Sequence, residues 1–150
     1  ESKTTQCRID FPYIPTYLAF REIPALADLV EEKEDVIYLV DGQGVLHPRG
    51  LGIASHIGVA FDIATIGAAK SLLVGLVKGE GKTSSPILLD GKVRGHLLSK
   101  EGKQTFVSVG HKVSLKSAVK ICRRFLNNGI PDPLKEAHRL ANAARTGARK

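Results

Sequence analysis

The stretch VIYLV at residues 36–40, followed by DGQG at residues 41–44, decides the fold. Five successive apolar residues rich in β-formers predict a strand that is buried on both faces and central in a sheet covered by helices. Asp41 would then lie at the carboxyl end of that strand, where open α/β sheets place their ligand sites. The glycines after it let backbone approach a ligand closely, although a tight turn that begins at Asp41 would use them equally well.

The segments around this strand alternate between helical and extended patterns. Two prolines, Pro12 and Pro15, predict a rigid turn, after which a helix ends near Glu32. Further strands are predicted at residues 65–69, 87–89, 93–98 and 105–109, and further helices at residues 51–61, from Ser114 to Asn128-Gly129, and from Asp132-Pro133 onward. This order predicts an α/β domain with a mixed sheet.

Length and composition exclude several classes of protein. The chain has 150 residues, of which 43% are apolar and 25% charged, so we expect one globular domain rather than a disordered or fibrous chain. The longest uncharged stretch, Gly50–Phe61, has 12 residues and is too short to span a bilayer. No secretory leader opens the sequence, and two cysteines cannot build a disulfide framework or a zinc cluster. We therefore expect a cytoplasmic protein with no membrane contact.

Charge is distributed unevenly along the chain. Residues 1–110 contain 12 basic and 13 acidic side chains, whereas residues 111–150 contain 10 basic and 2 acidic ones. A basic surface of this kind attracts polyanions, and nucleic acid is the first candidate. The alternative is a solvated helix surface in a basic protein.

Two carboxylates and two cationic or titratable groups are candidates for chemistry. Asp41 and Glu22 could together hold Mg²⁺, which takes one or two carboxylates in addition to phosphate and water. His47 and Lys70 would lie near the same strand ends, where a lysine can offset the charge of a phosphate in a transition state.

A series of motifs resembles the endonuclease V family from about residue 9 to about residue 140. The motifs are PYIP at 12–15, LAFRE at 18–22, VDGQG at 40–44, HPR at 47–49, GIASHIG at 52–58, TIG at 65–67 with Lys70, and VSVGHKVS at 107–114. The resemblance implies a ribonuclease H-like mixed sheet with helices on both faces. It also implies an endonuclease that repairs deaminated adenine by cutting DNA or RNA at the second phosphodiester bond 3′ of inosine. The products would carry 3′-hydroxyl and 5′-phosphate ends, and the metal would be Mg²⁺ or Mn²⁺.

The resemblance also assigns roles to individual residues. Asp41 and Glu22 match the metal carboxylates, His47 and Lys70 match residues near the scissile phosphate, and His138 resembles a histidine near the metal. Tyr13 resembles a wedge that replaces the stacking lost when the base is extruded. The rest of the wedge motif and the residues that match the lining of the hypoxanthine pocket are Pro12, Ile14, Pro15, Leu18, Gly42, Gly44, Ile53 and Leu73.

The sequence departs from the family pattern at two places. Thr16 follows the wedge where the family has Gly or Ser, so a side chain would approach the base pocket. The family also has a metal-binding Asp on a first strand well upstream of the wedge, and neither Glu1 nor Asp10 fits that motif. We therefore expect a single domain, residues 1–150, without the N-terminal hairpin: either a fragment or a truncated homologue.

Three functions follow from these observations. The leading hypothesis is a Mg²⁺-dependent, inosine-directed endonuclease that acts as a monomer. The second is a non-catalytic module that binds inosine in nucleic acid, because the first metal Asp is absent. The third, a pseudo-enzyme with no nucleic-acid role, is disfavoured by the basic end of the chain. The sequence does not distinguish DNA from RNA as the natural substrate.

Overall fold

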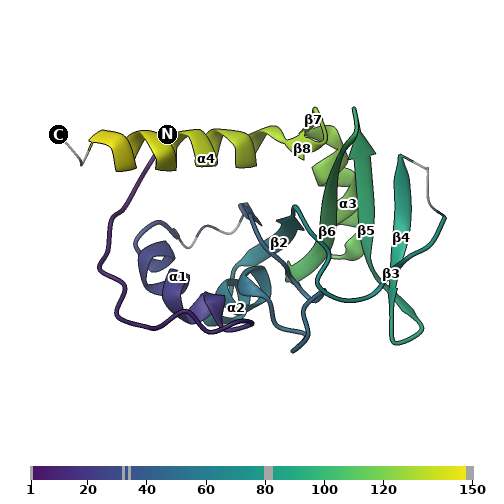
Figure 1. The fold of residues 1–150 in the computed structure, drawn as a ribbon, viewed down its shortest axis with the longest axis horizontal. Helices are drawn as coiled ribbons and strands as arrows, with labels where there is room; N and C mark the ends of the chain where they lie inside the picture. Colours follow the sequence, from purple (N-terminus) through teal and green to yellow (C-terminus); the bar gives the residue numbers. More distant parts are fainter. Residues whose placement is uncertain (1, 32, 34, 80–82, 148–150) are drawn as a thin grey trace.

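A mixed β-sheet carries the fold, and its elements were located in a computed structural model that describes residues 2–31, 33, 35–79 and 83–147. Within those residues the sheet has six strands in the order β1-β2-β6-β5-β4-β3 (Figure 1). Only β1 and β2 are parallel; every other neighbouring pair is antiparallel. The strands are β1 (Ile37–Val40), β2 (Ala64–Ala69), β3 (Leu76–Val77), β4 (Ser84–Leu89), β5 (Lys92–Lys100) and β6 (Lys103–His111).

Helices cover both faces of this sheet, as predicted. The helices are α1 (Leu18–Ala27), α2 (Ile53–Ala60), α3 (Leu115–Arg124) and α4 (Asp132–Gly147). On one face, the Thr65 hydroxyl of β2 donates a hydrogen bond of 2.7 Å to the Ala54 carbonyl of α2. On the other face, Ile66 of β2 packs with residues of α3. Successive residues of a strand point to opposite faces, so α2 and α3 lie on opposite sides of the sheet.

The predicted strand at residues 36–40 forms as β1 and is partly buried on both faces, but the prediction that it is central in the sheet is wrong within the described residues. Within the described residues β1 pairs only with β2, and Ile37 is 43% exposed. Tyr38 and Val40 contact the cluster formed by α1 and α2, whereas Leu39 contacts the cluster beneath α3. The apolar run thus reflects cover on both faces, and hydrophobicity carries no information on whether both edges of a strand are paired.

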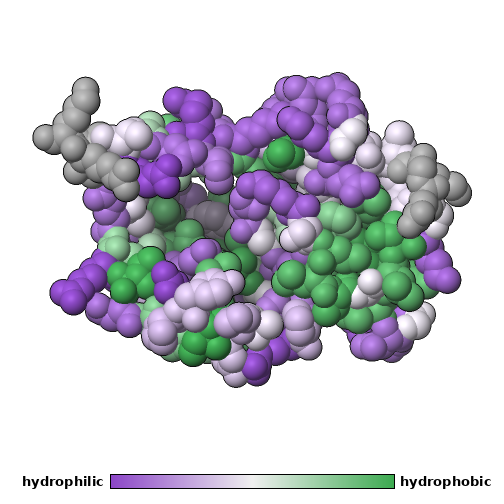
Figure 2. Space-filling model, viewed as in Figure 1, coloured by the Kyte–Doolittle hydropathy of each residue, from purple (hydrophilic) through white to green (hydrophobic). Residues whose placement is uncertain are grey.

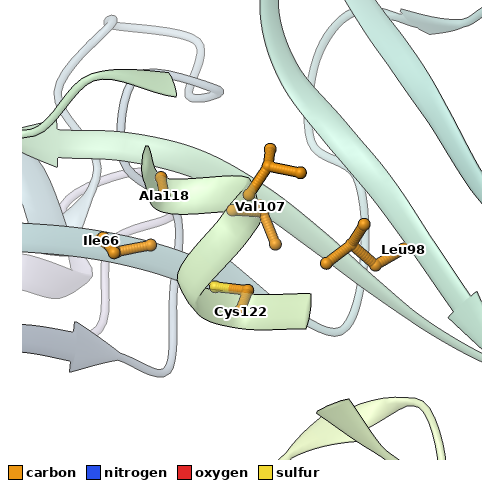
Figure 3. Packing of buried hydrophobic residues seen from close by; sticks show 6 residues of the cluster. Ile66, Leu98, Val107, Ala118 and Cys122 are labelled. Carbon is orange, nitrogen blue, oxygen red and sulfur yellow. The ribbon is translucent and has the colours of Figure 1, made fainter. Parts of the chain in front are cut away.

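Helix α3 begins where the sequence places it. The Ser114 hydroxyl accepts a hydrogen bond of 3.1 Å from the Ser117 backbone N–H and caps the first turn. Ala118 and Cys122 are fully buried against Ile66, Leu98 and Val107 of the sheet (Figure 3). Burial raises the pKa of the Cys122 thiol to about 12, so this cysteine acts as a small apolar core residue.

Two boundaries differ from the sequence prediction. Helix α1 ends at Ala27, ahead of the predicted end at Glu32, a residue outside the described ranges. Asn128-Gly129 does not end a helix directly, because α3 already stops at Arg124. Both residues have positive φ, 48° and 72°, and form the turn of a short hairpin, β7 (Leu126–Asn127) with β8 (Ile130–Pro131).

The chain segment after β1 crosses closely over β2. A Cβ on Gly67 of β2 would overlap the Gly44 backbone nitrogen and lie 2.8 Å from the carbonyl carbon of Gln43. The Gly44 N–H in turn donates a hydrogen bond of 2.9 Å to the Ser108 hydroxyl of β6. Residues 42–44 are therefore clamped on the sheet, and this contact fixes where Asp41 stands relative to the end of β2.

We predict that Gly67→Ala destabilises the fold by about 1–3 kcal/mol, because the added methyl group forces the crossing segment off the sheet. Denaturant unfolding followed by circular dichroism measures this loss. Gly91→Asn is the control, since Gly91 lies in an open turn with φ of 72°, which Asn tolerates. Equal stability of Gly67→Ala and the wild type would contradict the close crossing.

Candidate functional site

The parallel pairing of β1 with β2 brings Asp41 and Lys70 together. Val40 pairs with Gly67, and each strand ends at the same edge of the sheet. The Lys70 ammonium lies 3.2 Å from an Asp41 carboxylate oxygen, with the two side chains 55% and 42% exposed. A solvated ion pair of this kind contributes less than about 1 kcal/mol, so either partner can be exchanged for a ligand at little cost.

Glu22 of α1 and His138 of α4 share a hollow with Asp41. All three line a hollow of about 310 Å³ over β1. Figure 2 shows the surface hollowed between α4 and α1 in this region. Glu22 is half-buried, and its pKa is raised first by desolvation and then by the negative charge of Asp41. Two carboxylates that repel one another in a partly desolvated hollow form a site that favours a cation.

The donor set fits a hard divalent cation in part. No group of three His, Cys, Asp or Glu side chains within the described ranges is placed to hold a metal ion. Glu22 and Asp41 supply two carboxylates, and Mg²⁺ commonly takes one or two carboxylates and completes its shell with water and substrate phosphate. The residues present therefore fit a Mg²⁺ ion whose remaining ligands come from elsewhere.

A second pocket, of about 500 Å³, opens beside the Asp41–Lys70 pair; we call it the proline-loop pocket. Most of the side chains predicted to contact a base lie around it. Tyr13 is 68% exposed and stands among these lining residues. The predicted residues that line the pocket are Tyr13, Pro15, Leu18, Asp41, Gly42, His47, Ile53, Lys70 and Leu73.

The loop that carries Tyr13 is fastened by two arginines. Arg49 donates a hydrogen bond of 3.3 Å to the Thr16 hydroxyl, and its guanidinium lies 4.0 Å from the centre of the Tyr17 ring. Arg21 donates to the Phe11 carbonyl at 3.1 Å. Thr16 lines the pocket and has φ of 69°, a conformation that is strained for a β-branched residue. The threonine thus both narrows the pocket and anchors the loop through Arg49.

His47 is buried in the wall of this pocket, with 8% of its surface exposed. Its Nδ1 accepts a hydrogen bond of 3.3 Å from the Arg49 backbone N–H. Desolvation, followed by the charge of Arg49, lowers the pKa of the imidazole below its usual 6.5. His47 is therefore neutral at pH 7, with Nε2 carrying the proton and able to donate a hydrogen bond.

Three of the predicted contact residues lie outside the pocket lining. Pro12 and Ile14 are exposed on the loop next to Tyr13, and the Ile14 carbonyl accepts a hydrogen bond of 3.0 Å from the Tyr17 N–H. Gly44 is buried one layer behind the pocket, where a Cβ would overlap the Val109 carbonyl of β6. Gly44 therefore allows the segment after β1, residues 42–44, to lie directly against the sheet.

Gln43 was not singled out from the sequence, yet it lies in the pocket wall with 5% of its surface exposed. Its Nε2 donates a hydrogen bond of 2.6 Å to the Ser71 carbonyl, which ties the end of β1 to the segment after β2. Its Oε1 has no partner within the described residues. A polar side chain between two glycines at a strand end is the signal that could have indicated this residue.

A larger pocket, of about 1020 Å³, lies between the N-terminal segment, α1 and α4. Its lining contains none of the predicted functional residues. The candidate functional side chains therefore lie at the smaller pockets. These pockets are lined by Glu22 of α1, Asp41 after β1, Lys70 after β2 and His138 of α4.

Comparison with known proteins identifies the relationship. The Endonuclease V family model matches residues 1–139. The chain belongs to the endonuclease V family. Endonuclease V of Thermofilum pendens is 46% identical over 149 residues, which cover 95% of this chain and 64% of the relative. Endonuclease V of Thermus thermophilus is 44% identical over 146 residues, with 89% and 64% covered.

Solved endonuclease V structures share the fold. The Streptomyces avermitilis structure aligns with a TM-score of 0.82 and 33% identity over 95% of this chain and 66% of that one. The catalytic domain of human endonuclease V aligns with a TM-score of 0.82 and 34% identity, covering 93% and 67%. The Ciona intestinalis enzyme, solved with a 24mer DNA containing an inosine followed by a ribo-adenosine, aligns at 0.83 and 32%, covering 96% and 71%. The predicted ribonuclease H-like fold is confirmed.

The chain spans 64% of the length of the first curated relatives it matches. None of the helices within the described residues is long and apolar enough to cross a membrane.

We predict that Glu22→Gln stabilises the fold at pH 7 in EDTA. Because the pKa of Glu22 lies above its usual 4.5 in the folded chain, the fold favours the protonated carboxyl. That contribution is complete below pH 4.5 and is lost as the pH rises through the raised pKa. The gain in melting temperature should therefore shrink as the pH falls towards 4.

In Mg²⁺ we expect the opposite order, with the wild type melting at a higher temperature than Glu22→Gln. The ion should raise the melting temperature of the wild type more, because only the wild type keeps both carboxylates. Glu101→Gln, at the exposed turn between β5 and β6, serves as the control. A lower melting temperature of Glu22→Gln in EDTA at pH 7 would contradict the electrostatic account of the hollow.

Proposed function

We propose that this chain carries the lesion pocket and part of the metal site of a Mg²⁺-dependent endonuclease that cuts nucleic acid at the second phosphodiester bond 3′ of inosine. The observation that carries the proposal is the position of Asp41. It lines the proline-loop pocket, the hollow shared with Glu22 and His138, and a third hollow shared with Lys70 and Lys135. A pocket for a base and a charged centre for a phosphate are thus contiguous.

Base recognition would use the proline-loop pocket. A volume of about 500 Å³ is ample for a purine, and Gly42, Ile53 and Leu73 give it a small and largely apolar lining. Tyr13, held on a loop between two prolines, would fill the gap left in the strand and replace lost stacking. The exposure of its ring suits that role, since a wedge must reach the nucleic acid before the base is extruded.

Phosphate binding would use the groups around Asp41. The Lys70 side chain can exchange its ion pair with Asp41 for one with a phosphate oxygen. The ammonium would then stabilise the negative charge that develops on the phosphate during cutting. Neutral His47 can donate a hydrogen bond from Nε2 to the same phosphate or to the leaving oxygen. His138 of α4 lines the hollow that also contains Asp41 and Lys70.

Glu22 and Asp41 would hold the Mg²⁺ ion, which when bound supplies Lewis-acid activation of water and of the phosphate. Their mutual repulsion and the desolvation of Glu22 support this assignment. Mn²⁺ has the same preference for oxygen ligands and would serve as well. The inosine-containing DNA in the Ciona intestinalis structure supports inosine as the target, and RNA remains a second substrate to test.

A second function is favoured by one observation. The described residues offer two carboxylates but no group of three metal ligands. A chain that holds the metal weakly would bind inosine-containing strands without cutting them. Salt-sensitive binding with a preference for inosine, and no Mg²⁺-dependent nick, would support this module over the nuclease.

We predict that Asp41→Asn lowers the rate of Mg²⁺-dependent nicking by at least about 100-fold, because a ligand of the activating ion is lost. Binding to the same inosine oligonucleotide should change by less than about threefold, since the proline-loop pocket remains. Rates come from gel analysis of end-labelled strands and affinities from fluorescence anisotropy. Asp90→Asn, in the exposed hairpin turn between β4 and β5, is the matched control. Nicking by Asp41→Asn at the wild-type rate would rule out its role as a metal ligand.

A further inference from the structure

A basic surface borders the site on the side of the β7–β8 hairpin. We propose that this surface, the lysine edge, binds the sugar–phosphate backbone of the nucleic-acid strand as it leaves the site. The inference rests on the proposed function and extends it to the nucleotides that flank the lesion. The lysine edge consists of Lys100 and Lys103 at the ends of β5 and β6, Arg123 and Arg124 at the end of α3, and Lys135 in α4.

The members of the lysine edge are joined by contacts through one hairpin. Lys100 donates a hydrogen bond of 3.4 Å to the Leu126 carbonyl, and Lys135 donates to the Asn127 carbonyl. The turn residue Gly129 lies directly against the Cβ of Lys103, and its carbonyl accepts a hydrogen bond of 2.7 Å from Thr105. Cations from β5, β6 and α4 thus contact three residues of the hairpin, Leu126, Asn127 and Gly129.

Charge on this surface is largely unbalanced. Lys100, Lys103, Arg123 and Arg124 are exposed, and none of them forms an ion pair with any other described residue. Lys135 is 3.5 Å from Asp132, and Glu101 lies at the turn between β5 and β6. The surface therefore keeps an excess of positive charge, which attracts a polyanion and releases its counterions.

One arrangement on this surface opposes folding. Lys100 and Lys103 are directly paired across the antiparallel strands β5 and β6. Like charges in that position destabilise a hairpin. A repulsive pair at a strand end is readily explained if both ammonium groups meet phosphates in the complex.

An exposed aromatic ring accompanies the cations. Phe125 follows α3, is 43% exposed, and has the Arg124 guanidinium 6.0 Å from its ring centre. An aromatic ring beside arginine and lysine is the arrangement with which proteins stack the bases of single strands. This combination favours nucleic acid over an acidic protein as the occupant.

The lysine edge is continuous with the site. Lys135 and the hairpin residue Ile130 line the hollow that also contains Asp41 and Lys70. In Figure 2, hydrophilic side chains cover the top of the molecule over α4 and the β7–β8 hairpin, in the same view as Figure 1. A strand whose phosphate lies at Asp41 can therefore continue past Lys135 and Ile130 onto the rest of the lysine edge.

The test compares K103Q/R124Q with the wild type, both as the whole chain. Neither side chain has a hydrogen bond or ion pair among the described residues, and K103Q removes the repulsion with Lys100, so the melting temperature should not fall. Fluorescence anisotropy measures binding of single-stranded DNA with one central inosine, as a 25-mer and as a 7-mer that occupies the site alone. For the 25-mer we expect affinity to fall about 20-fold or more at 0.1 M salt, and the salt slope to fall by about 1.5. For the 7-mer the change should stay below about twofold.

The matched control is K92Q/R94Q, which removes two exposed cations at the other end of β5, about 25 Å along the strand from Lys100. A loss on the 25-mer no larger than that of the control, or an equal loss on both oligonucleotides, would overturn the proposal. The preference of the wild type for inosine over adenine in the 25-mer reports separately on the proposed function. Without such a preference the proposed function fails, whereas a selective loss of 25-mer binding would still assign the lysine edge to nucleic acid.

Discussion

The close crossing of residues 42–44 over Gly67 is the contact on which the site depends. Because no side chain separates the two segments, the chain leaving β1 lies flat on β2 before it enters the loop. Asp41 is thereby held 3.2 Å from Lys70, and Gln43 reaches the Ser71 carbonyl. One packing constraint thus sets both the charged centre and one wall of the proline-loop pocket.

Electrostatics at this point follow from burial and neighbours. Glu22 is partly desolvated beside Asp41, which favours its protonation until a cation arrives. Asp41 is meanwhile paired with Lys70, whose ammonium is exposed enough to move to a phosphate. Under the proposed function, a metal ion would relieve the repulsion between Glu22 and Asp41, and a phosphate would take the Lys70 ammonium that Asp41 then gives up.

Local patterns in the sequence were sufficient for much of the fold. The apolar runs predicted β1 and β2, and Ser114 predicted the start of α3. That β1 pairs with β2 alone among the described residues was not predictable, because pairing depends on strands distant in sequence. Asn128-Gly129 illustrates the same limit, since one dipeptide ends a helix or turns a hairpin depending on where the preceding helix stops.

The strand-end position of Asp41 and Lys70 follows from the sequence pattern, whereas His138 and the residues proposed to contact the base rest on the resemblance alone. Glu22, Asp41, Lys70 and His138 come from four elements, and no sequence interval requires that they meet. Gln43 and Lys135 were missed because their roles arise from tertiary contacts, with the Ser71 carbonyl and with the β7–β8 hairpin. The excess of cations near the end of the chain was visible in the sequence, but its gathering into one edge beside Asp41 required the fold.

The most direct test of the account is the position of a cut made by the purified chain. A duplex DNA and a single-stranded RNA, each with one inosine, are incubated with Mg²⁺ or with EDTA, and the product ends are mapped. We expect a Mg²⁺-dependent nick at the second phosphodiester bond 3′ of inosine, because the proposed base pocket and phosphate centre share Asp41. A nick at another position, or one that ignores inosine, would contradict the coupling of the two.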